Sequence, residues 1–509
     1  MKKQDSEILN QRQEELAERL DPNWLPQADT PIFSAGNIHY EISARTQAIN
    51  YGGLGLAVLL VKSVGLADEL DKSLHLLKRH HPYHESDHIL NMVYNIVTGG
   101  QCLEDLEIRR QDVGYLDALN AQRIPDPTTE GDFLRRFQEQ DVITFMDTIN
   151  RVRSRIWREQ QSDKRRLAII DVDGTITETM GETKEKADFA YNGKWGYCPL
   201  VVSLANTQEP LYIINRPASR PSHDGAVKIM DRAVNWARDA NFARVRLRGD
   251  TDFSLTTEFD RWTREGVEFV FGIDAHPSFI RIAEGLSEKS YEPLERSAKW
   301  TVKTTPRTRP FNVKKAVVRE KGYENRRLQA EHVAEVEYTP SKAKAKENEK
   351  YRMVILRKNI SVEKGEEHLF DDIVYFFYVT NISCSELTAK DVVRQANLRC
   401  NQENLIEQLK NGVKATRLPV AEFVGNWAYM VIGALAWSLK IWLGLVLPRR
   451  LNASQLITME FRRFCNEVMQ IPAQILNRGR RLIFRLLGYN RWVEVLLEGS
   501  QHLKATAFA

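Results

Sequence analysis

The chain has 509 residues, of which 42% are hydrophobic and 28% are charged, and its formal net charge is +4. This composition is typical of a globular protein and excludes a wholly disordered chain, and the length is sufficient for more than one domain. The five cysteines are scattered singly, which argues against a disulfide framework or a cysteine-rich zinc site and favours a reducing compartment. The basic first residues are followed by no apolar segment, so we expect no secretory signal.

The small net charge conceals a segregation of basic residues. Residues 299–360 contain 17 lysines and arginines against 7 glutamates, and residues 448–509 contain 10 against 4. The remainder of the chain is therefore acidic overall. One basic segment alone would most simply be a solvated face, but two such segments favour a polyanionic partner.

Residues 1–160 are predicted to be mainly helical, because apolar residues recur at helical spacing in the segments 55–77, 87–97, 100–119 and 130–157. Within this region lie four histidines that could suggest a metal site, namely His80, His81, His84 and His88. Their spacing is interrupted by a proline and fits no common metal site. The segment is therefore interpreted as a polar loop followed by the start of a helix.

From residue 166 onward the pattern changes to alternating strands and helices. Strands are predicted at 167–172, 196–206 and 210–216, a helix at 223–242, a strand at 243–253, a short helix at 255–265 and a strand at 267–273. Two further strands, at 351–357 and 373–380, and a helix at 391–409 follow. The apolar segment 423–447 is interrupted by Asn426 and Lys440, so a buried helix is favoured over a membrane span.

Two aspartates stand at the end of the first of these strands, in the sequence Asp171-Val-Asp173-Gly-Thr. Such an ending also occurs without any catalytic role, because glycine tolerates turn conformations. The motif resembles that of haloacid dehalogenase-like phosphatases, in which the first aspartate is the nucleophile and the second is an acid/base. It also resembles the first strand of DDE transposases, where an aspartate that precedes a small residue and threonine binds metal, which would select Asp173. The strand before Asp250 alternates with arginine, and this counts against the phosphatase, whose parallel strands are usually continuously apolar.

The order of three strands, a helix, a strand, a helix and a strand resembles the RNase H-like core of DDE transposases. The resemblance implies that three carboxylates converge as catalytic residues and metal ligands. These are Asp173 after the first strand, Asp250 after the fourth strand, and Glu403 in the helix that follows the basic segment. Oxygen ligands of this kind suit a pair of hard divalent cations.

The sequence around Glu403 resembles the YREK signature of bacterial insertion-sequence transposases. Arg399, Glu403 and Lys410 match its arginine, glutamate and lysine at the required spacings and share one face of a helix. The tyrosine position is occupied by Ala396, which departs from the signature. The resemblance implies that Arg399 and Lys410 bind the DNA phosphates beside the metal ligand.

The complete resemblance implies an α/β protein with an RNase H-like catalytic core at 161–447, which contains a β-rich insertion at about 285–380. A helical N-terminal region that binds DNA ends (1–160) and a basic helical C-terminal region (448–509) would flank this core. The implied activity is metal-dependent cut-and-paste transposition of an insertion sequence. Two Mg²⁺ ions, replaceable by Mn²⁺, would be the cofactor.

The implied partners are double-stranded DNA, as transposon ends and as target, and a second copy of the chain in a homodimeric synaptic complex. No membrane partner is expected, and the location would be the bacterial cytoplasm, associated with the nucleoid. Trp300, in the basic segment, is a candidate to stack on a DNA base, although it could equally pack in the insertion's own core. A phosphatase that uses Asp171 and Asp173, or a DNA-binding derivative without activity, are the alternatives.

Overall fold

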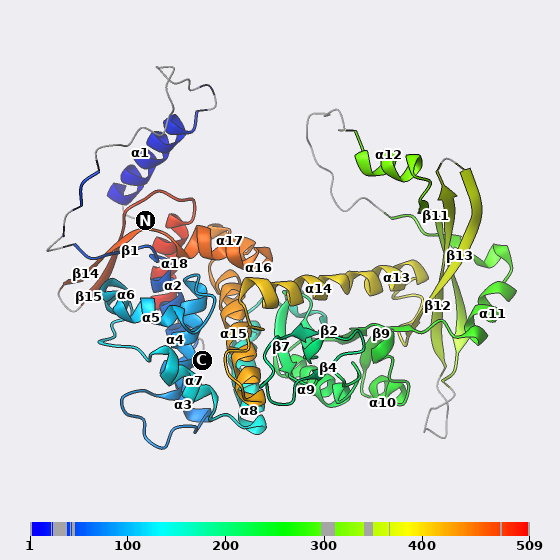
Figure 1. Cartoon of the computed structure of the whole chain (residues 1–509), viewed down its shortest axis with the longest axis horizontal. Coiled ribbons are helices and arrows are strands. Elements are labelled where there is room, and N and C mark those ends of the chain that lie inside the picture. The colour runs from blue at the N-terminus through cyan, green and yellow to red at the C-terminus, as the bar shows by residue number, and fades with distance from the viewer. Residues whose placement is uncertain are drawn as a thin grey trace.

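The computed structural model describes residues 3–21, 23, 38–40, 42, 46–296, 311–340, 350–365, 367–478 and 481–506. A bundle of helices at one end of the molecule is followed by a central sheet and then by long strands that project at the other end (Figure 1). Trp300 lies outside the described residues, and the expectation about its role stays a prediction.

The N-terminal part is helical, as predicted. Its helices are α1 (Lys3–Arg19), α2 (Leu54–Ser63), α3 (Leu66–Ser73), α4 (Glu85–Val97), α5 (Asp105–Gln111), α6 (Val113–Ala118), α7 (Pro127–Leu134) and α8 (Glu139–Arg158). Polar side chains define several of the helix starts. Asp126, for example, caps α7 by accepting a hydrogen bond from the backbone amide of Thr129, an otherwise unpaired donor of the first turn.

Five strands of a nine-stranded sheet form the part that we call the central sheet, in the order β7 (Glu209–Ile214), β6 (Leu200–Leu204), β2 (Ala168–Gly174), β8 (Val245–Gly249) and β9 (Val267–Ile273). β2 pairs antiparallel with β6 and parallel with β8, and β8 pairs parallel with β9. The predicted sequence of elements is found, with α9 (Ala226–Asp239) before β8 and α10 (Phe259–Arg264) before β9. The predicted strand 196–206 is divided between β6 and β5 (Trp195–Tyr197), which forms a small separate sheet with β3 (Thr177–Glu178) and β4 (Asp188–Phe189).

Helices cover both faces of the central sheet. α9 contacts β2, β6, β7 and β8 from one face. The other face is covered by α13 (Ala389–Leu398) and α14 (Cys400–Glu407), which follow one another in a line across the molecule (Figure 1). Because side chains alternate across a strand, Asp171 and Asp173 of β2 point to the same face. This is the face of α13, since Arg248, which pairs with Asp171, also donates to the carbonyl of Gln395 in α13.

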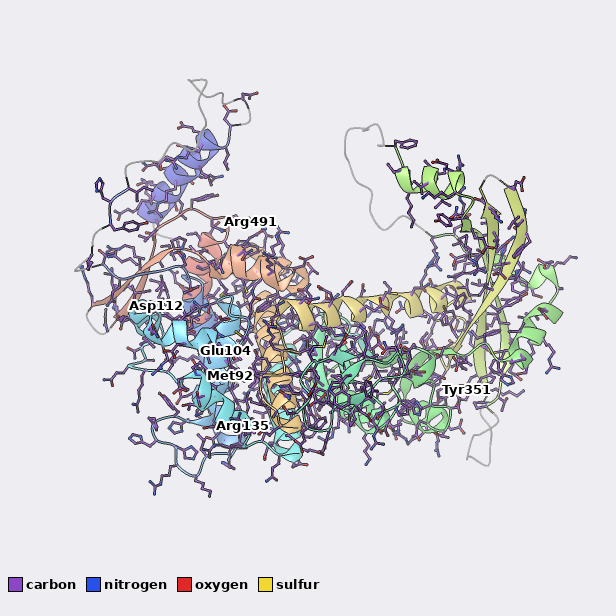
Figure 2. The ribbon with its side chains drawn as sticks, viewed as in Figure 1. Met92, Glu104, Asp112, Arg135, Tyr351 and Arg491 are labelled. Carbon is purple, nitrogen blue, oxygen red and sulfur yellow. The ribbon has the colours of Figure 1, made fainter. Side chains whose placement is uncertain are left out.

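The insertion continues the central sheet instead of forming a sheet of its own. β13 (Glu367–Thr380) pairs antiparallel with β9, and β12 (Tyr351–Lys364), β11 (Glu324–Tyr338) and β10 (Glu292–Pro293) follow in order. α11 (Pro277–Gly285) and α12 (Val313–Glu320) belong to the same region. Tyr351, at the base of β12 (Figure 2), packs on the rings of Phe259 and Phe269 and donates a hydrogen bond to Asp260. The projecting strands are thereby attached to the core by buried aromatic packing.

The apolar segment forms a single helix, α15 (Phe423–Val446), which is buried along its whole apolar length. By length and composition alone this helix could cross a membrane. Its burial against α4, α8 and β7 agrees with the predicted core helix, because a helix that is apolar on all sides must be surrounded by protein or lipid.

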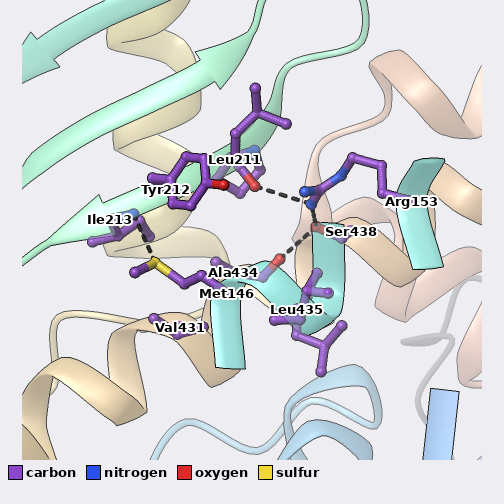
Figure 3. A pocket seen from close by; sticks show the side chains of 11 residues that line it. Met146, Arg153, Leu211, Tyr212, Ile213, Val431, Ala434, Leu435 and Ser438 are labelled. Carbon is purple, nitrogen blue, oxygen red and sulfur yellow. Dashed lines mark hydrogen bonds between the residues drawn. The ribbon is translucent and has the colours of Figure 1, made fainter. Parts of the chain in front are cut away.

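A buried polar cluster connects α15, α8 and the edge strand β7. The carboxylate of Glu209 accepts hydrogen bonds from Arg153, Trp157 and Trp442, each at 3.0 Å. Arg153 also donates to the hydroxyl of Ser438 in α15, toward which it points in Figure 3. This cluster attaches the helical region to the sheet, and removing either Arg153 or Glu209 would leave the other as a buried charge without its ionic partner.

The C-terminal region is not wholly helical, and this part of the sequence-based prediction is wrong. α16 (Gln455–Thr458), α17 (Phe461–Phe464) and α18 (Val493–Ala505) are present, but a β-hairpin of β14 (Ala473–Arg478) and β15 (Arg481–Leu486) lies between them. β14 also pairs with β1 (Ala48–Ile49) near the start of the chain, and α18 packs on α2. Most of the hairpin's pairing is between its own two strands, and its mixture of apolar and basic residues also fits an amphipathic helix.

Candidate functional site

The two strand-end aspartates lie together at one edge of the central sheet. Asp173 is the penultimate residue of β2, and Asp250 directly follows β8, its parallel neighbour. The guanidinium of Arg399 lies between them, with its Nη1 at 2.9 Å from Oδ2 of Asp173 and at 3.8 Å from Oδ2 of Asp250. The carboxyl ends of adjacent parallel strands meet at the same edge, so the sheet topology itself produces this pair of carboxylates.

The site is short of positive charge even with Arg399 in place. Burial raises the pKa of Asp173 to about 6, with Arg399 opposing the shift and Asp250 adding to it. Burial also raises the pKa of Asp250, again against the effect of Arg399. Desolvation and a like charge both disfavour the ionised carboxylate, so a further cation at this edge would stabilise the pair.

Arg399 reaches the aspartates from the junction between α13 and α14. α14 is held against the sheet by Gln402, whose buried side chain donates to the carbonyl of Val201 at 3.1 Å and accepts a hydrogen bond from Ser203. Gln402 was not identified from the sequence, where it is one more polar residue in a charged helix. It fixes the position of α14 and therefore of Arg399.

Glu403 is exposed on α14, one helical turn after Arg399. In the described part of the chain, no group of three or more histidine, cysteine, aspartate or glutamate side chains is placed so that it could hold a metal ion. The structure therefore brings together Asp173, Asp250 and Arg399 from the predicted site, and it does not bring Glu403 into contact with the two aspartates.

Lys410 lies in a π-helical turn, η4 (Gln408–Gly412), directly after α14. Its ammonium donates a hydrogen bond of 2.8 Å to the carbonyl of Ile176, in the loop after β2. Burial, and then the nearby charge of Lys194, lower the pKa of Lys410. Lys410 thus attaches the turn at the end of α14, the helix that contains Glu403, to the loop that follows Asp173. π-helical turns of this kind often accompany functional sites.

Asp171 has a structural role that argues against the phosphatase alternative. Its two carboxylate oxygens accept hydrogen bonds from Nε and Nη2 of Arg248 at 2.7 and 2.8 Å, and both side chains are buried. A carboxylate held in a bidentate ion pair is neither accessible nor free to attack a phosphate. In addition, β2 is antiparallel to β6, which leaves the sheet mixed.

The same pairing explains the arginines that alternate along β8. All five residues of this strand are buried, and Arg246 reaches the carboxylate of Glu268 on β9 while Arg248 reaches Asp171 on β2. These cross-strand ion pairs allow charged side chains to lie inside the sheet.

Ala396, at the tyrosine position of the signature, packs on the small apolar cluster beneath α13.

The two aspartates are suitable ligands for a divalent cation. They supply hard oxygen donors from neighbouring strands, and their raised pKa values show that their negative charge is incompletely compensated. Asp173 and Asp250 would hold such an ion, and Glu403 could add a third carboxylate only after a rearrangement of its side chain or of α14. Two of the three expected metal ligands, Asp173 and Asp250, are therefore positioned to bind a divalent cation, and the third, Glu403, is not.

The sequence was compared with known proteins and structures. The family model described as transposase DDE domain group 1 matches residues 46–507. No match is found among curated proteins. The solved structure of a piggyBac transposase synaptic complex with hairpin DNA is similar at 11% sequence identity and a TM-score of 0.34, covering 83% of this chain and 84% of that one. Because the family model spans nearly the whole chain, the protein belongs to the DDE transposase family.

Proposed function

We propose that this protein is a DNA transposase that cuts its element at both ends and joins it to target DNA. The observation that carries the proposal is the pair of Asp173 and Asp250, which lie at the ends of adjacent parallel strands around Arg399, in a chain of the DDE transposase family. Two carboxylates at one sheet edge supply hard oxygen ligands of the kind that a divalent cation prefers, and such a cation supports cleavage of a phosphodiester.

The fold around the site supports an RNase H-like core. The strand order β7-β6-β2-β8-β9 has the first three strands antiparallel and the last three parallel, with β2 in the centre. The adjacency of β2 and β8 agrees with the convergence of Asp173 and Asp250 that the resemblance to an RNase H-like core implied. The ends of β2 and β8 lie beside the junction of α13 and α14, from which Arg399 reaches both aspartates, and this supports the proposal.

Each residue of the site has a proposed role. Asp173 and Asp250, joined by Glu403 after its side chain or α14 rearranges, would hold two Mg²⁺ ions, for which Mn²⁺ would substitute. When bound, these ions would activate the attacking oxygen and stabilise the leaving oxygen. Arg399 would offset part of the negative charge of the two aspartates in the free protein and turn to the scissile phosphate when DNA is bound. Lys410 orients the loop after β2 and contributes positive charge toward the same phosphate.

The remaining parts of the chain would recognise DNA and assemble the complex. The helical region, 1–160, would bind the transposon ends, and the insertion, with its excess of lysine and arginine, would lie against DNA near the active site. A homodimer would hold two ends together in the bacterial cytoplasm. Cut-and-paste chemistry at one site needs only water and then the freed 3′-hydroxyl as successive nucleophiles.

The decisive experiment is incubation of the protein with DNA that carries the ends of its own element, in the presence of Mg²⁺. Strand nicks at the element boundary are expected, and Asp173→Asn, Asp250→Asn and Glu403→Gln should each abolish them while end binding persists. Glu407→Gln, on the same exposed side of α14, is the matched control and should cut normally. Binding without cleavage by the wild-type protein would identify it as an inactive derivative.

A further inference from the structure

A surface hollow in the helical region is lined by arginines from four separate segments. It has a volume of about 500 Å³ and lies between the loop after α3, the end of α5, the loop before α7 and the end of α7. Its cationic side chains are Arg79, Arg110, Arg123 and Arg136. This hollow is remote in sequence from Asp173 and Asp250, and none of its lining residues belongs to the proposed catalytic site.

The positive charge of the hollow is poorly compensated by the protein. Of the four arginines, within the described residues, only Arg110 forms an ion pair, and its partner Glu107 is itself exposed. The carboxylate in the lining, Asp126, is already engaged as the cap of α7, where it accepts hydrogen bonds from the amide and hydroxyl of Thr129. All four arginines are exposed and line the same hollow, so their guanidinium groups are accessible to an anion there, and their combined positive potential would attract one.

The floor of the hollow is aromatic and firmly held. The guanidinium of Arg123 lies 5.7 Å from the centre of the Tyr83 ring, and that ring meets His88 edge to face. His88 is buried, stacks on Phe133 and contacts the buried carboxylate of Glu130 at 3.0 Å. His88, one of the four histidines interpreted as a polar loop and helix start, thus holds the partly accessible ring of Tyr83 against the core.

We propose that this hollow binds one nucleotide unit, with the phosphate at the arginines and the base against Tyr83. Arginine pairs with phosphate through two parallel hydrogen bonds, and an aromatic ring stacks on any base. The volume suits a ligand of this size. A phosphodiester of bound DNA is the source that follows if the proposed function holds, and a free nucleotide has the same chemistry.

The test uses the full-length protein without divalent metal, so that cleavage has no influence. Binding of a labelled DNA duplex is measured by fluorescence anisotropy over a range of salt concentrations, for wild type and for Arg123→Gln/Arg136→Gln. The variant should lose roughly tenfold or more in affinity per arginine, as expected for charged hydrogen bonds. The slope of log affinity against log salt should flatten by about 0.9 for each lost phosphate contact.

Lys62→Gln/Lys72→Gln is the matched control, because it removes two exposed positive charges from α2 and α3 outside the hollow. A second measurement follows the melting temperature with added dAMP or inorganic phosphate. If the duplex is bound normally but dAMP stabilises the wild type and not the arginine variant, the site takes a free nucleotide. In Tyr83→Leu, dAMP should raise the melting temperature no more than inorganic phosphate does, because the ring that stacks on the base is absent.

The proposal is overturned if the arginine variant matches the lysine control in duplex affinity and salt slope and if neither small ligand raises the melting temperature of the wild type. Failure of the proposed function would look different. A wild-type protein that binds DNA through these arginines but makes no nick with Mg²⁺ would retain the binding site and lose only the catalytic assignment.

Discussion

At the scale of single residues, Asp171 and Asp173 show how neighbours on one strand acquire different roles. Asp171 forms a buried ion pair with Arg248, while Asp173 faces Arg399 and Asp250 at the end of the strand. The difference arises from register. Asp171 stands opposite Arg248 in the parallel pair of β2 and β8, whereas Asp173 lies beyond that pairing.

The two aspartates should therefore respond differently to the same substitution. Asp171→Asn leaves the buried Arg248 without its anionic partner and should destabilise the protein by about 3–5 kcal/mol. Asp173→Asn removes a carboxylate whose ionisation is already disfavoured by burial, so the melting temperature should be unchanged or higher while cleavage is lost. Melting curves and a nicking assay on both variants decide the matter. Normal nicking by Asp173→Asn would exclude it as a ligand.

Arg399 and Lys410 should affect catalysis through the phosphate. Arg399→Ala and Lys410→Ala are each expected to lower the nicking rate by roughly tenfold to a hundredfold, because each removes a charge-assisted contact. Arg394→Ala is the control, since Arg394 is exposed on α13 and pairs with Asp391. Wild-type rates in both site variants would show that the match to the YREK signature is accidental.

At the scale of elements, the sequence predicted those whose pattern is local and missed those that depend on distant partners. The apolar run before Asp171 and the amphipathic α9 were found because their own residues carry the signal. β11 and the hairpin of β14 and β15 were missed. β11 is made of charged and half-buried residues that pair along β12, and the mixture of basic and apolar residues in the hairpin also fits an amphipathic helix. The approach of Asp173 and Asp250 was expected from the resemblance to an RNase H-like core, but the docking of α14 through Gln402 was not expected.

The central helix α15 carries a lysine that should make stability depend on pH. Lys440 is buried, its ammonium contacts the carbonyl oxygens of Ile457 and Met459 and lies over the ring of Trp437, and burial lowers its pKa to about 7. Between pH 7 and its ordinary pKa of 10.5 the unfolded chain binds a proton that the folded protein lacks. The free energy of unfolding should therefore rise with pH over this interval. Below pH 7, the full destabilisation caused by burying the protonated Lys440 should be present.

Lys440→Met removes this titration and serves as the comparison. The free energy of unfolding of the variant minus that of the wild type should be largest below pH 7 and should shrink by several kcal/mol toward pH 10.5. Urea unfolding at both ends of the interval measures it. A difference that is independent of pH would show that Lys440 is neutral, or equally protonated, in both states.

At the scale of the whole molecule, the helical region and the insertion stand at opposite ends of the line of α13 and α14 (Figure 1). Both ends carry basic side chains, with the arginine-lined hollow at one end and α12 at the other. The proposed active site lies between them, beneath the junction of α13 and α14. A DNA duplex bound across the site would have contacts at both ends, so affinity should depend on charges far from the aspartates.

α12 provides the last test, because its lysines are exposed and belong to the insertion, between two of the proposed catalytic residues in sequence. Lys314→Gln/Lys315→Gln should weaken duplex binding and flatten the dependence of log affinity on log salt by up to about 1.8, if each lysine neutralises one phosphate. The melting temperature should be unaffected, since neither side chain is buried. Lys62→Gln/Lys72→Gln again controls for the loss of two charges. If both double variants bind alike, the insertion does not contact DNA at α12, and its basic residues are only a solvated surface.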